Sequence, residues 1–440
     1  MTRKSVVAKL VLAAWLISMA GQAWAFCGFY VAKADTRLFN KASKVVIARD
    51  GDNTAITMAN DYQGDPREFA LIVPVPQVLK RDQIHVTEPA VIDHIDAYTA
   101  PRLVEYFDRN PDHEGRLMAL AQPESLPKSG PKARAKSLGV KVEAEYTVGE
   151  YDIVILSAQE SGGLLTWLTQ AGYNVPAKAK PVVTSYLGQG MKFFVAKVNL
   201  AKKTALGFTY LRPLRISFTS KQFMLPIRLG MINADGPQEL FIFILTRAGR
   251  VETANYRTQR IPTDISVPLY VKDTFGAFYR DMFERTRKRE SGPVVFLEYA
   301  WDMNWCDPCA ADPMSAHELK ELGVKWLDSG PVLPLRPNAQ PTDRRLVFVT
   351  RLHMRYDKAA YKDDVVFRET GDRNNMQGRY VLRHPWLGRP DSDRGRAYIR
   401  GLPGRFESEA QNLARLTGWD IATIRQRMQD GGQPFDIKLR

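Results

Sequence analysis

Cysteine and histidine are scarce in this sequence, which has three Cys and six His among 440 residues. This scarcity excludes a disulfide-rich scaffold and a zinc-binding module built from repeated Cys and His pairs. The sequence also lacks a phosphate-binding loop, a Gly-rich dinucleotide turn and a Gly-x-Ser-x-Gly nucleophile motif. Because no motif indicates an enzyme class, we expect a non-catalytic protein with no cofactor and no bound metal.

Long apolar runs are also absent beyond the first 25 residues. A basic start is followed by an apolar run over 10–20 and then by Ala23-Trp-Ala25, which supplies small residues at a cleavage site. This layout is typical of a secretory signal peptide, and the run is too short to span a bilayer. We predict that residues 1–25 are a signal peptide. The mature chain is then expected to begin at Phe26, to have no transmembrane segment, and to be located in the periplasm or outside the cell.

Basic residues outnumber acidic ones, with 62 Lys and Arg against 48 Asp and Glu and a net charge of +14. In a cytoplasmic protein this balance would suggest nucleic-acid binding, but an exported chain meets no nucleic acid. The remaining anions are phospholipid headgroups and acidic envelope polymers, to which we expect weak attraction. The alternative is that the cations only keep the surface solvated.

Alternation of apolar and polar residues, with turn residues between the runs, predicts many strands and few helices. We therefore expect a mainly β protein with some helices, of the α+β class, with antiparallel packed sheets in two or three subdomains and a helical C-terminal tail. The predicted strands are 44–49 and 54–58, joined by an Asp-Gly hairpin turn, and 69–73, 151–157, 191–200, 214–218, 239–246 and 346–356; the predicted helices include 160–171, 407–416 and 420–428.

Two segments divide the chain. Residues 123–142 have few large apolar side chains, so we expect a flexible basic linker or loop, cut first by trypsin and dispensable for folding. Residues 330–342 contain four Pro and form a Pro-rich connection without regular structure. The predicted units are an N-terminal β-rich region (26–122), a central β-rich region with helices (143–329), and C-terminal strands with a helical tail (343–440).

The motif Cys306-Asp-Pro-Cys309 brings two thiols close enough for a disulfide. A structural disulfide is one interpretation, and a thiol–disulfide oxidoreductase is the other. Redox catalysis would place Cys306 at the start of a helix, whereas the helix signal begins later, with Asp312 as cap and an end at Leu322 before Gly323. We therefore favour the structural disulfide and keep the redox enzyme as the alternative.

Cys27 makes the cysteine count odd. Since an oxidising compartment seldom leaves a free thiol, we predict that Cys27 packs beside Cys306 and Cys309, with its Cα within about 7 Å of one of theirs. A disulfide from Cys27 to Cys306 or Cys309 is the alternative to a disulfide between Cys306 and Cys309.

Aromatic residues gather before the Cys motif. If 294–301 is a strand, Tyr299 and Trp301 share a face and, with Trp305, form a candidate stacking platform for a sugar or peptide. Packing of these rings in the core is the favoured alternative. On the strand at 346–356, His353 lies between two Arg on a polar face, for which we expect an ordinary exposed surface, with an anion site as the alternative.

Several segments resemble, in order, a bacterial family catalogued as domain of unknown function twenty-three thirty. The resemblance implies an exported bacterial protein and carries no activity. The matching segments cover most of 27–385 and are CGFY at 27–30, GDPREFALIVPVP at 64–76, WLTQAGY at 167–173, LPIRLG at 225–230 and WCDPC at 305–309.

These observations predict an exported soluble envelope protein that binds a partner or has a structural role without catalysing a reaction. The partner is expected in the envelope and is not identified by the sequence. The alternative function is thiol–disulfide exchange through Cys306 and Cys309.

Overall fold

The computed structural model describes most of the chain and has a mixed α+β fold, as predicted. The signal peptide (1–25), Cys27, the linker (123–142) and the Pro-rich connection (330–342) lie outside the described residues. The described residues are 29–32, 42–59, 69–112, 144–157, 161–170, 173, 175–199, 211–232, 234, 236–306, 309–328 and 346–437.

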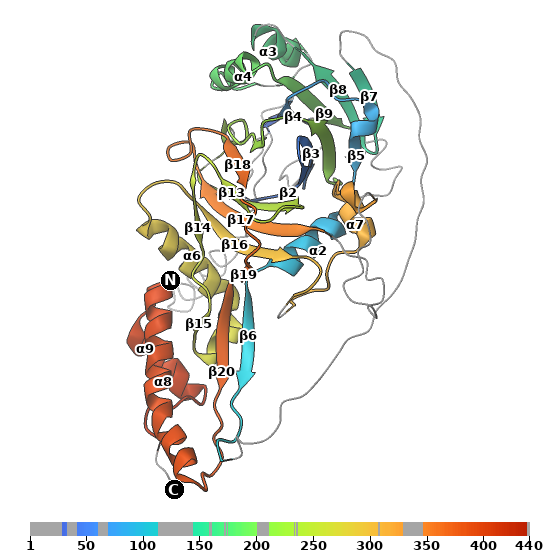
Figure 1. Cartoon of the computed structure of the whole chain (residues 1–440). Helices are drawn as coiled ribbons and strands as arrows, with labels where there is room; N and C mark the ends of the chain where they lie inside the picture. The colour runs from blue at the N-terminus through green and yellow to red at the C-terminus, as the bar shows by residue number, and fades with distance from the viewer. Residues whose placement is uncertain are drawn as a thin grey trace, which may run out of the picture.

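Nine of the described strands form the large sheet at the centre of the molecule (Figure 1). Their order is β14-β16-β17-β12-β2-β3-β10-β5, and β19 also pairs with β16, on the side away from β17. The pairs β2–β12 and β14–β16 are parallel. The strands therefore come from all three units predicted from the sequence. They are β2 (Ala42–Asp50), β3 (Asn53–Met58), β5 (Ile84–Val86), β10 (Leu214–Thr219), β12 (Gln238–Thr246), β14 (Arg257–Arg260), β16 (Val294–Asp302), β17 (Phe348–Tyr356) and β19 (Met376–Gln377).

The predicted hairpin is present between β2 and β3. Asp50 pairs with Asn53, and Gly51 in the turn has a φ of +57°, a left-handed conformation that favours glycine.

Five further described strands form the small sheet, in the order β1-β4-β9-β8-β7 with antiparallel pairing throughout. One face packs on the large sheet, and helices α3 and α4 cover the other. The bounds are β1 (Phe29–Ala32), β4 (Phe69–Val75), β7 (Ala144–Val148), β8 (Tyr151–Leu156), β9 (Lys192–Val198), α3 (Ser161–Gln170) and α4 (Ala179–Gly188).

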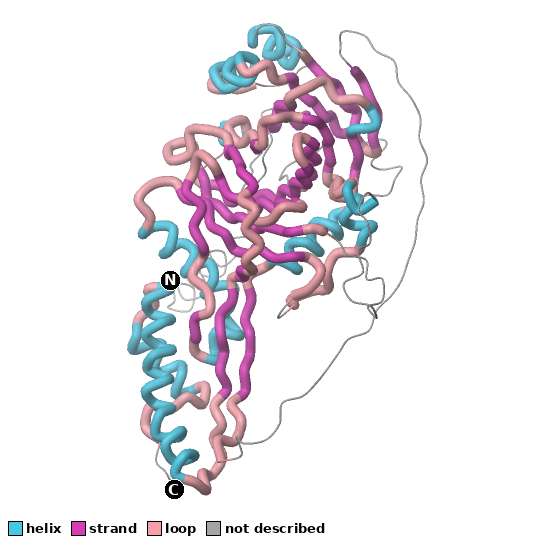
Figure 2. Tube along the Cα trace, in the orientation of Figure 1, coloured by secondary structure: helices cyan, strands magenta, loops and turns pink. Residues whose placement is uncertain are grey.

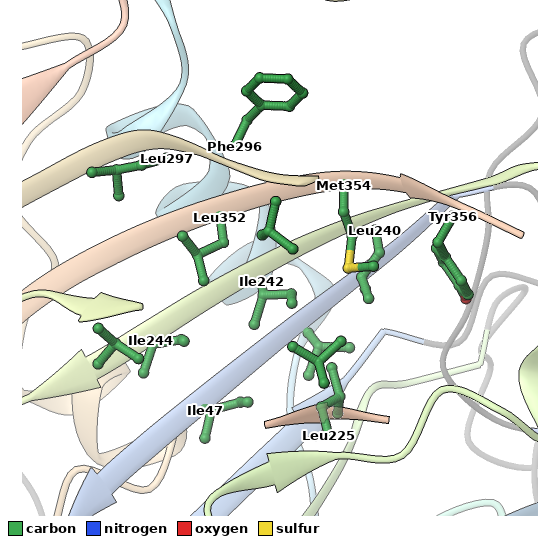
Figure 3. Close-up of a cluster of buried hydrophobic side chains, with 14 of the residues drawn as sticks. Ile47, Leu225, Leu240, Ile242, Ile244, Phe296, Leu297, Leu352, Met354 and Tyr356 are labelled. Carbon is green, nitrogen blue, oxygen red and sulfur yellow. The ribbon is translucent and has the colours of Figure 1, made fainter. Parts of the chain in front are cut away.

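The large sheet is covered on both faces. On one face, side chains of β12 and β17 such as Ile242 and Leu352 (Figure 3) belong to one apolar cluster with side chains of the small sheet such as Leu71. On the other face lie the helices α2 (Pro89–Thr99) and α7 (Ala316–Glu321). Because both faces are buried, the sequence of β12 is a nearly continuous apolar run. Each fully buried Leu or Ile side chain contributes about 2–3 kcal/mol to the free energy of unfolding.

A narrow arm extends from the large sheet. Its parallel strands β15, β20 and β6 pack with α6, α8 and α9, and Figure 2 shows α8 and α9 at the opposite end of the molecule from α3 and α4. None of the described helices is long and apolar enough to cross a membrane. The bounds are β6 (Arg102–Phe107), β15 (Ile265–Ser266), β20 (Arg379–His384), α6 (Phe275–Arg289), α8 (Asp393–Thr417) and α9 (Ile421–Asp430). A short sheet of β11 (Met224–Leu225), β18 (Val365–Glu369) and β13 (Val251–Thr253) completes the fold.

The predicted C-terminal helices are present, but α8 begins fourteen residues before the predicted 407–416. Three Gly and Pro403 weaken the helix signal in its first half. The Ser392 side chain caps the helix at Gly395 N, and buried Ile399 and Phe406 fix it by tertiary packing.

Candidate functional site

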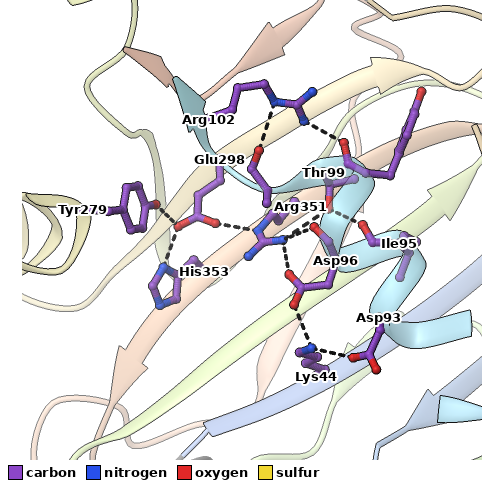
Figure 4. Close-up of polar contacts among 12 residues, drawn as sticks. Lys44, Asp93, Ile95, Asp96, Thr99, Arg102, Tyr279, Glu298, Arg351 and His353 are labelled. Carbon is purple, nitrogen blue, oxygen red and sulfur yellow. Dashed lines mark hydrogen bonds and ion pairs between the residues drawn. The ribbon is translucent and has the colours of Figure 1, made fainter. Parts of the chain in front are cut away.

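Five ionisable side chains meet on the α2 face of the large sheet and form what we call the buried charge cluster (Figure 4). Positions 351 and 353 of β17 point to the same face because side chains alternate along a strand. The cluster consists of Lys44 on β2, Asp96 on α2, Glu298 on β16, and Arg351 and His353 on β17.

Glu298 is the centre of the cluster and has no exposed surface. The register between β16 and β17 shifts between Leu297 and Tyr299. This β-bulge allows Glu298 and Tyr299, although adjacent in sequence, both to lie on the α2 face of the sheet.

Both oxygens of Glu298 accept hydrogen bonds. Oε2 accepts from Arg351 Nε at 2.6 Å, and Oε1 accepts from His353 Nδ1 at 2.6 Å and from the Tyr279 hydroxyl of α6. Burial alone would raise the pKa of Glu298, but the charges of His353 and Arg351 and these hydrogen bonds outweigh it and lower the pKa to about 2. Glu298 is therefore a carboxylate at neutral pH.

A chain of alternating charges connects Glu298 to the surface. Arg351 Nη1 donates to Asp96 Oδ1 at 2.5 Å, and Lys44 Nζ lies 2.8 Å from Asp96 Oδ2 and 3.0 Å from Oδ1 of the exposed Asp93. Burial raises the pKa of Asp96, but the cations of Arg351 and Lys44 more than compensate and lower it. Through these contacts the cluster holds α2 and, through Tyr279, α6 against the sheet.

His353 is enclosed by aromatic rings. Its imidazole stacks between Phe241 at 4.2 Å and Phe283 at 3.9 Å, measured between ring centroids, and the residue is only 3% exposed. The expectation of an exposed polar face at His353 was therefore wrong, because α2 and α6 cover this face of the sheet. With its Nδ1 on Glu298 and aromatic rings on both sides, the imidazole is not open to a substrate, so the geometry favours a structural role for the cluster.

The two cysteines of the motif are bonded to each other. Cys306 and Cys309 have Cα atoms 5.1 Å apart; Cys306 is half-buried and Cys309 is exposed. Because this bond uses both sulfurs, neither is available to Cys27, whose own position lies outside the described residues.

Cys306 does not lie at the start of a helix, because α7 begins at Ala316. The predicted start at Asp312 was wrong, since Ser315 and Glu318 form a capping box that fixes the start later. The predicted stop is correct: Gly323 has a φ of +92°.

The three aromatic residues before the motif differ in exposure. Tyr299 and Trp301 lie in the core, and Tyr299 packs edge-on against Tyr98 of α2 with ring centroids 5.8 Å apart. Trp305 is 51% exposed and contacts Trp301 edge-to-face at 4.9 Å. Of the candidate platform, only Trp305 therefore presents a ring to solvent. In the described part of the chain, no group of three or more His, Cys, Asp or Glu is arranged to hold a metal ion.

A second buried carboxylate, Glu409 of α8, has fewer hydrogen bonds than Glu298. Its Oε2 accepts from Gln433 Nε2 at 2.8 Å, and its Oε1 lies 3.6 Å from Arg405 Nε without a hydrogen bond among the described residues. Burial raises the pKa of Glu409 to about 7, against the opposing effects of Gln433 and Arg405.

We expect Glu409 to destabilise the folded protein above neutral pH. Its folded pKa exceeds its ordinary value, so the native state loses stability as pH rises from about 4.5 through 7. Relative to the wild type, Glu409→Gln is expected to gain about 2–3 kcal/mol in unfolding free energy between pH 5 and pH 8, measured by urea unfolding. Glu407→Gln, at a partly exposed site on the same helix, is the control; equal pH profiles for wild type and Glu409→Gln would contradict the expectation.

A family model described as an uncharacterized protein conserved in bacteria, DUF2330, matches residues 21–368. The chain belongs to the DUF2330 family. The resemblance inferred from the five sequence segments is thereby confirmed. No curated protein and no solved structure matches the chain. The DUF2330 match contains the buried charge cluster and the disulfide and ends within β18, so β20, α8 and α9 of the arm lie beyond it.

Sequence reasoning missed Glu298, its hydrogen-bond partner Tyr279, and the pairing of Asp96 with Arg351. A signal for Glu298 was present: it is the one charged residue in the otherwise apolar stretch 294–301. A carboxylate in such a stretch must be paired when the strand is buried. The identity of its partners had no signal, because they lie on distant elements.

Proposed function

We propose that this DUF2330 protein is exported to the cell envelope and there binds a ligand or partner without catalysing a reaction. The absence of catalysis is proposed because the ionisable side chains of the buried charge cluster are enclosed by the protein. Glu298 accepts hydrogen bonds from Arg351 and His353, and each of the three residues is at most 5% exposed. Catalytic acids and bases must instead reach a substrate proton directly or through one water molecule.

Two features support export. The first 25 residues have the layout of a signal peptide. The Cys306–Cys309 bond, with Cys309 exposed, fits an oxidising compartment, because thiol reductants of the cytosol would reach and reduce such a bond.

The test of export is fractionation of cells that express the full chain, with mass spectrometry of the product. We expect an envelope protein whose first residue is Phe26, and a longer product from Ala25→Phe, which places a bulky residue at the cleavage site. An intact Arg3-Lys4 segment on a cytoplasmic protein would overturn the proposal.

The non-catalytic role of the Cys pair gives a separate prediction. Because the Cys306–Cys309 bond closes a loop of only four residues, the double variant Cys306→Ser/Cys309→Ser is expected to lose only about 2 kcal/mol of unfolding free energy. The wild type is expected not to accelerate disulfide formation in a reduced model protein. Acceleration by the wild type that the double variant lacks would instead establish the thiol–disulfide oxidoreductase.

A further inference from the structure

A polar hollow of about 110 Å³, open to solvent, lies beside the β2–β3 hairpin and is not part of the buried charge cluster. Its sides come from β10, from the residue Gln83 before β5, and from the turn after α7. This volume is smaller than that of sites that enclose a whole drug-sized ligand, so the hollow has room for one polar end of a small ligand, whose remainder stays in solvent.

Small side chains create the floor of the hollow. Ala48, Ala55 and Ser217 lie side by side on β2, β3 and β10, where Ala55 pairs with both of the others. Gly323 forms part of the wall, so close to the floor that a Cβ there would lie 2.3 Å from the Ala55 Cβ. The turn after α7 is thus fixed against the sheet, and the hollow has a defined shape.

The acceptor groups around the hollow are already engaged by neighbours. Arg247 Nε lies 3.0 Å from Asp50 Oδ1 and neutralises that carboxylate. Asn53 Oδ1 accepts from Thr219 Oγ1 at 3.1 Å, and Gln83 Oε1 accepts from the backbone N–H of Lys80 at 2.8 Å. Each of these acceptors already has one partner, and the Asp50 charge is paired, so they attract the donors of a ligand less than free acceptors would.

The donor groups around the hollow remain available. Among the described residues, the amide nitrogens Asn53 Nδ2 and Gln83 Nε2 and the ammonium group of the exposed Lys325 donate no hydrogen bond to a protein acceptor. Ser217 also lines the hollow. The hollow thus offers donors and one uncompensated positive charge.

We propose that this hollow binds the carboxylate of a small hydroxylated acid, of which a sugar acid is the representative class. One cation with two amide donors matches a monoanionic carboxylate, whereas a phosphate dianion is usually held by several cations or a ring of backbone amides. The hydroxyls of Ser217 and Thr219 can exchange hydrogen bonds with the hydroxyls of the ligand. The inference rests on the proposed binding function and gives it a ligand class.

The test is calorimetric titration of the purified protein with D-glucuronate at low salt and pH 7. We expect saturable binding that is at least tenfold tighter than binding of D-glucose, which lacks the charge, and tighter than binding of inorganic phosphate. Lys325→Gln is expected to weaken glucuronate binding about tenfold, the effect of losing one charged hydrogen bond. Lys358→Gln, at an exposed lysine outside the hollow, is the matched control and should bind like the wild type.

A second variant, Ser217→Met, fills the floor and should abolish binding, provided that its circular dichroism matches the wild type. A linear trimer of D-galacturonate distinguishes a polymer unit from a free acid: tighter binding of the trimer than of the D-galacturonate monomer identifies the polymer. Equal binding of glucose, tighter binding of phosphate, or an unchanged affinity in Lys325→Gln would each overturn the inference. An exported protein that fails to bind glucuronate leaves the proposed function intact, whereas a cytoplasmic protein contradicts the proposed function whatever it binds.

Discussion

Replacing Glu298 with Gln is expected to lower the free energy of unfolding by about 3–5 kcal/mol. The amide keeps the shape of the side chain but removes the charge that Arg351 and His353 face, and it turns an acceptor into a donor opposite other donors. Arg351 would then remain buried with only Asp96 as its ionic partner. Removing one member of a buried pair costs much more than the net value of the pair, because the other charge stays desolvated.

Urea unfolding at pH 7 measures this loss, with Asp393→Asn as the control. Asp393 also pairs with an arginine, Arg396 at 2.8 Å, but its side chain is 98% exposed. Surface pairs of this kind contribute about 0–1 kcal/mol. If the two variants lose the same small amount, the cluster does not hold α2 and α6 to the sheet.

The acid side of the stability profile provides an independent check on Glu298. Its folded pKa of about 2 lies below its ordinary value of 4.5, so the stability that it contributes is complete above about pH 5. That contribution is lost progressively as pH falls from 5 to 2, since both states become protonated. We expect the wild type to lose more unfolding free energy than Glu298→Gln over this range.

The second large effect is expected at Asp364, which connects the small sheet to the rest of the molecule. Its Oδ1 accepts from the Tyr186 hydroxyl of α4 at 2.6 Å and from the backbone N–H of Ile227 at 2.9 Å, and its Oδ2 accepts from Arg228 Nε at 3.0 Å. Asp364→Ala leaves three buried donors and the Arg228 charge without this acceptor. We expect a loss of about 3–5 kcal/mol in the free energy of unfolding.

The neighbouring Asp363 offers a matched control, since it is exposed and no hydrogen bond to its carboxylate is found among the described residues. Asp363→Asn should change the free energy of unfolding by less than about 0.5 kcal/mol. Thermal unfolding of both variants, followed by circular dichroism, makes the comparison. A small loss in Asp364→Ala would mean that Arg228 and Tyr186 find other partners.

Local sequence patterns correctly predicted the helices and strands in which apolar residues recur at a regular spacing. The strands at 214–218, 239–246 and 346–356 and the β2–β3 hairpin were predicted because apolar alternation and an Asp-Gly turn act over a few residues. The start of α8 was missed, since packing of Ile399 and Phe406 overrides weak local propensity.

Local sequence patterns could not predict which strands pair or which residues form the candidate sites. Arg351 bonds to Glu298, 53 residues earlier in the same sheet, and to Asp96 of α2, 255 residues earlier. Nothing in the sequence around any of these residues specifies its partners. The polar hollow likewise depends on Gly323 meeting Ala55, a contact set by the position of a whole helix.

The central position of β12 has a consequence for the time course of folding. Its parallel neighbour β2 is about 200 residues earlier in the chain, and its antiparallel neighbour β17 is about 100 residues later. Closing such long loops is entropically costly, and folding rates fall as the sequence separation of contacts increases. When the first 230 residues have been synthesised, β2 therefore still lacks a hydrogen-bonded partner on one side. We therefore expect the small sheet and the β2–β3 hairpin, whose strands all lie within the first 200 residues, to form before the large sheet is complete.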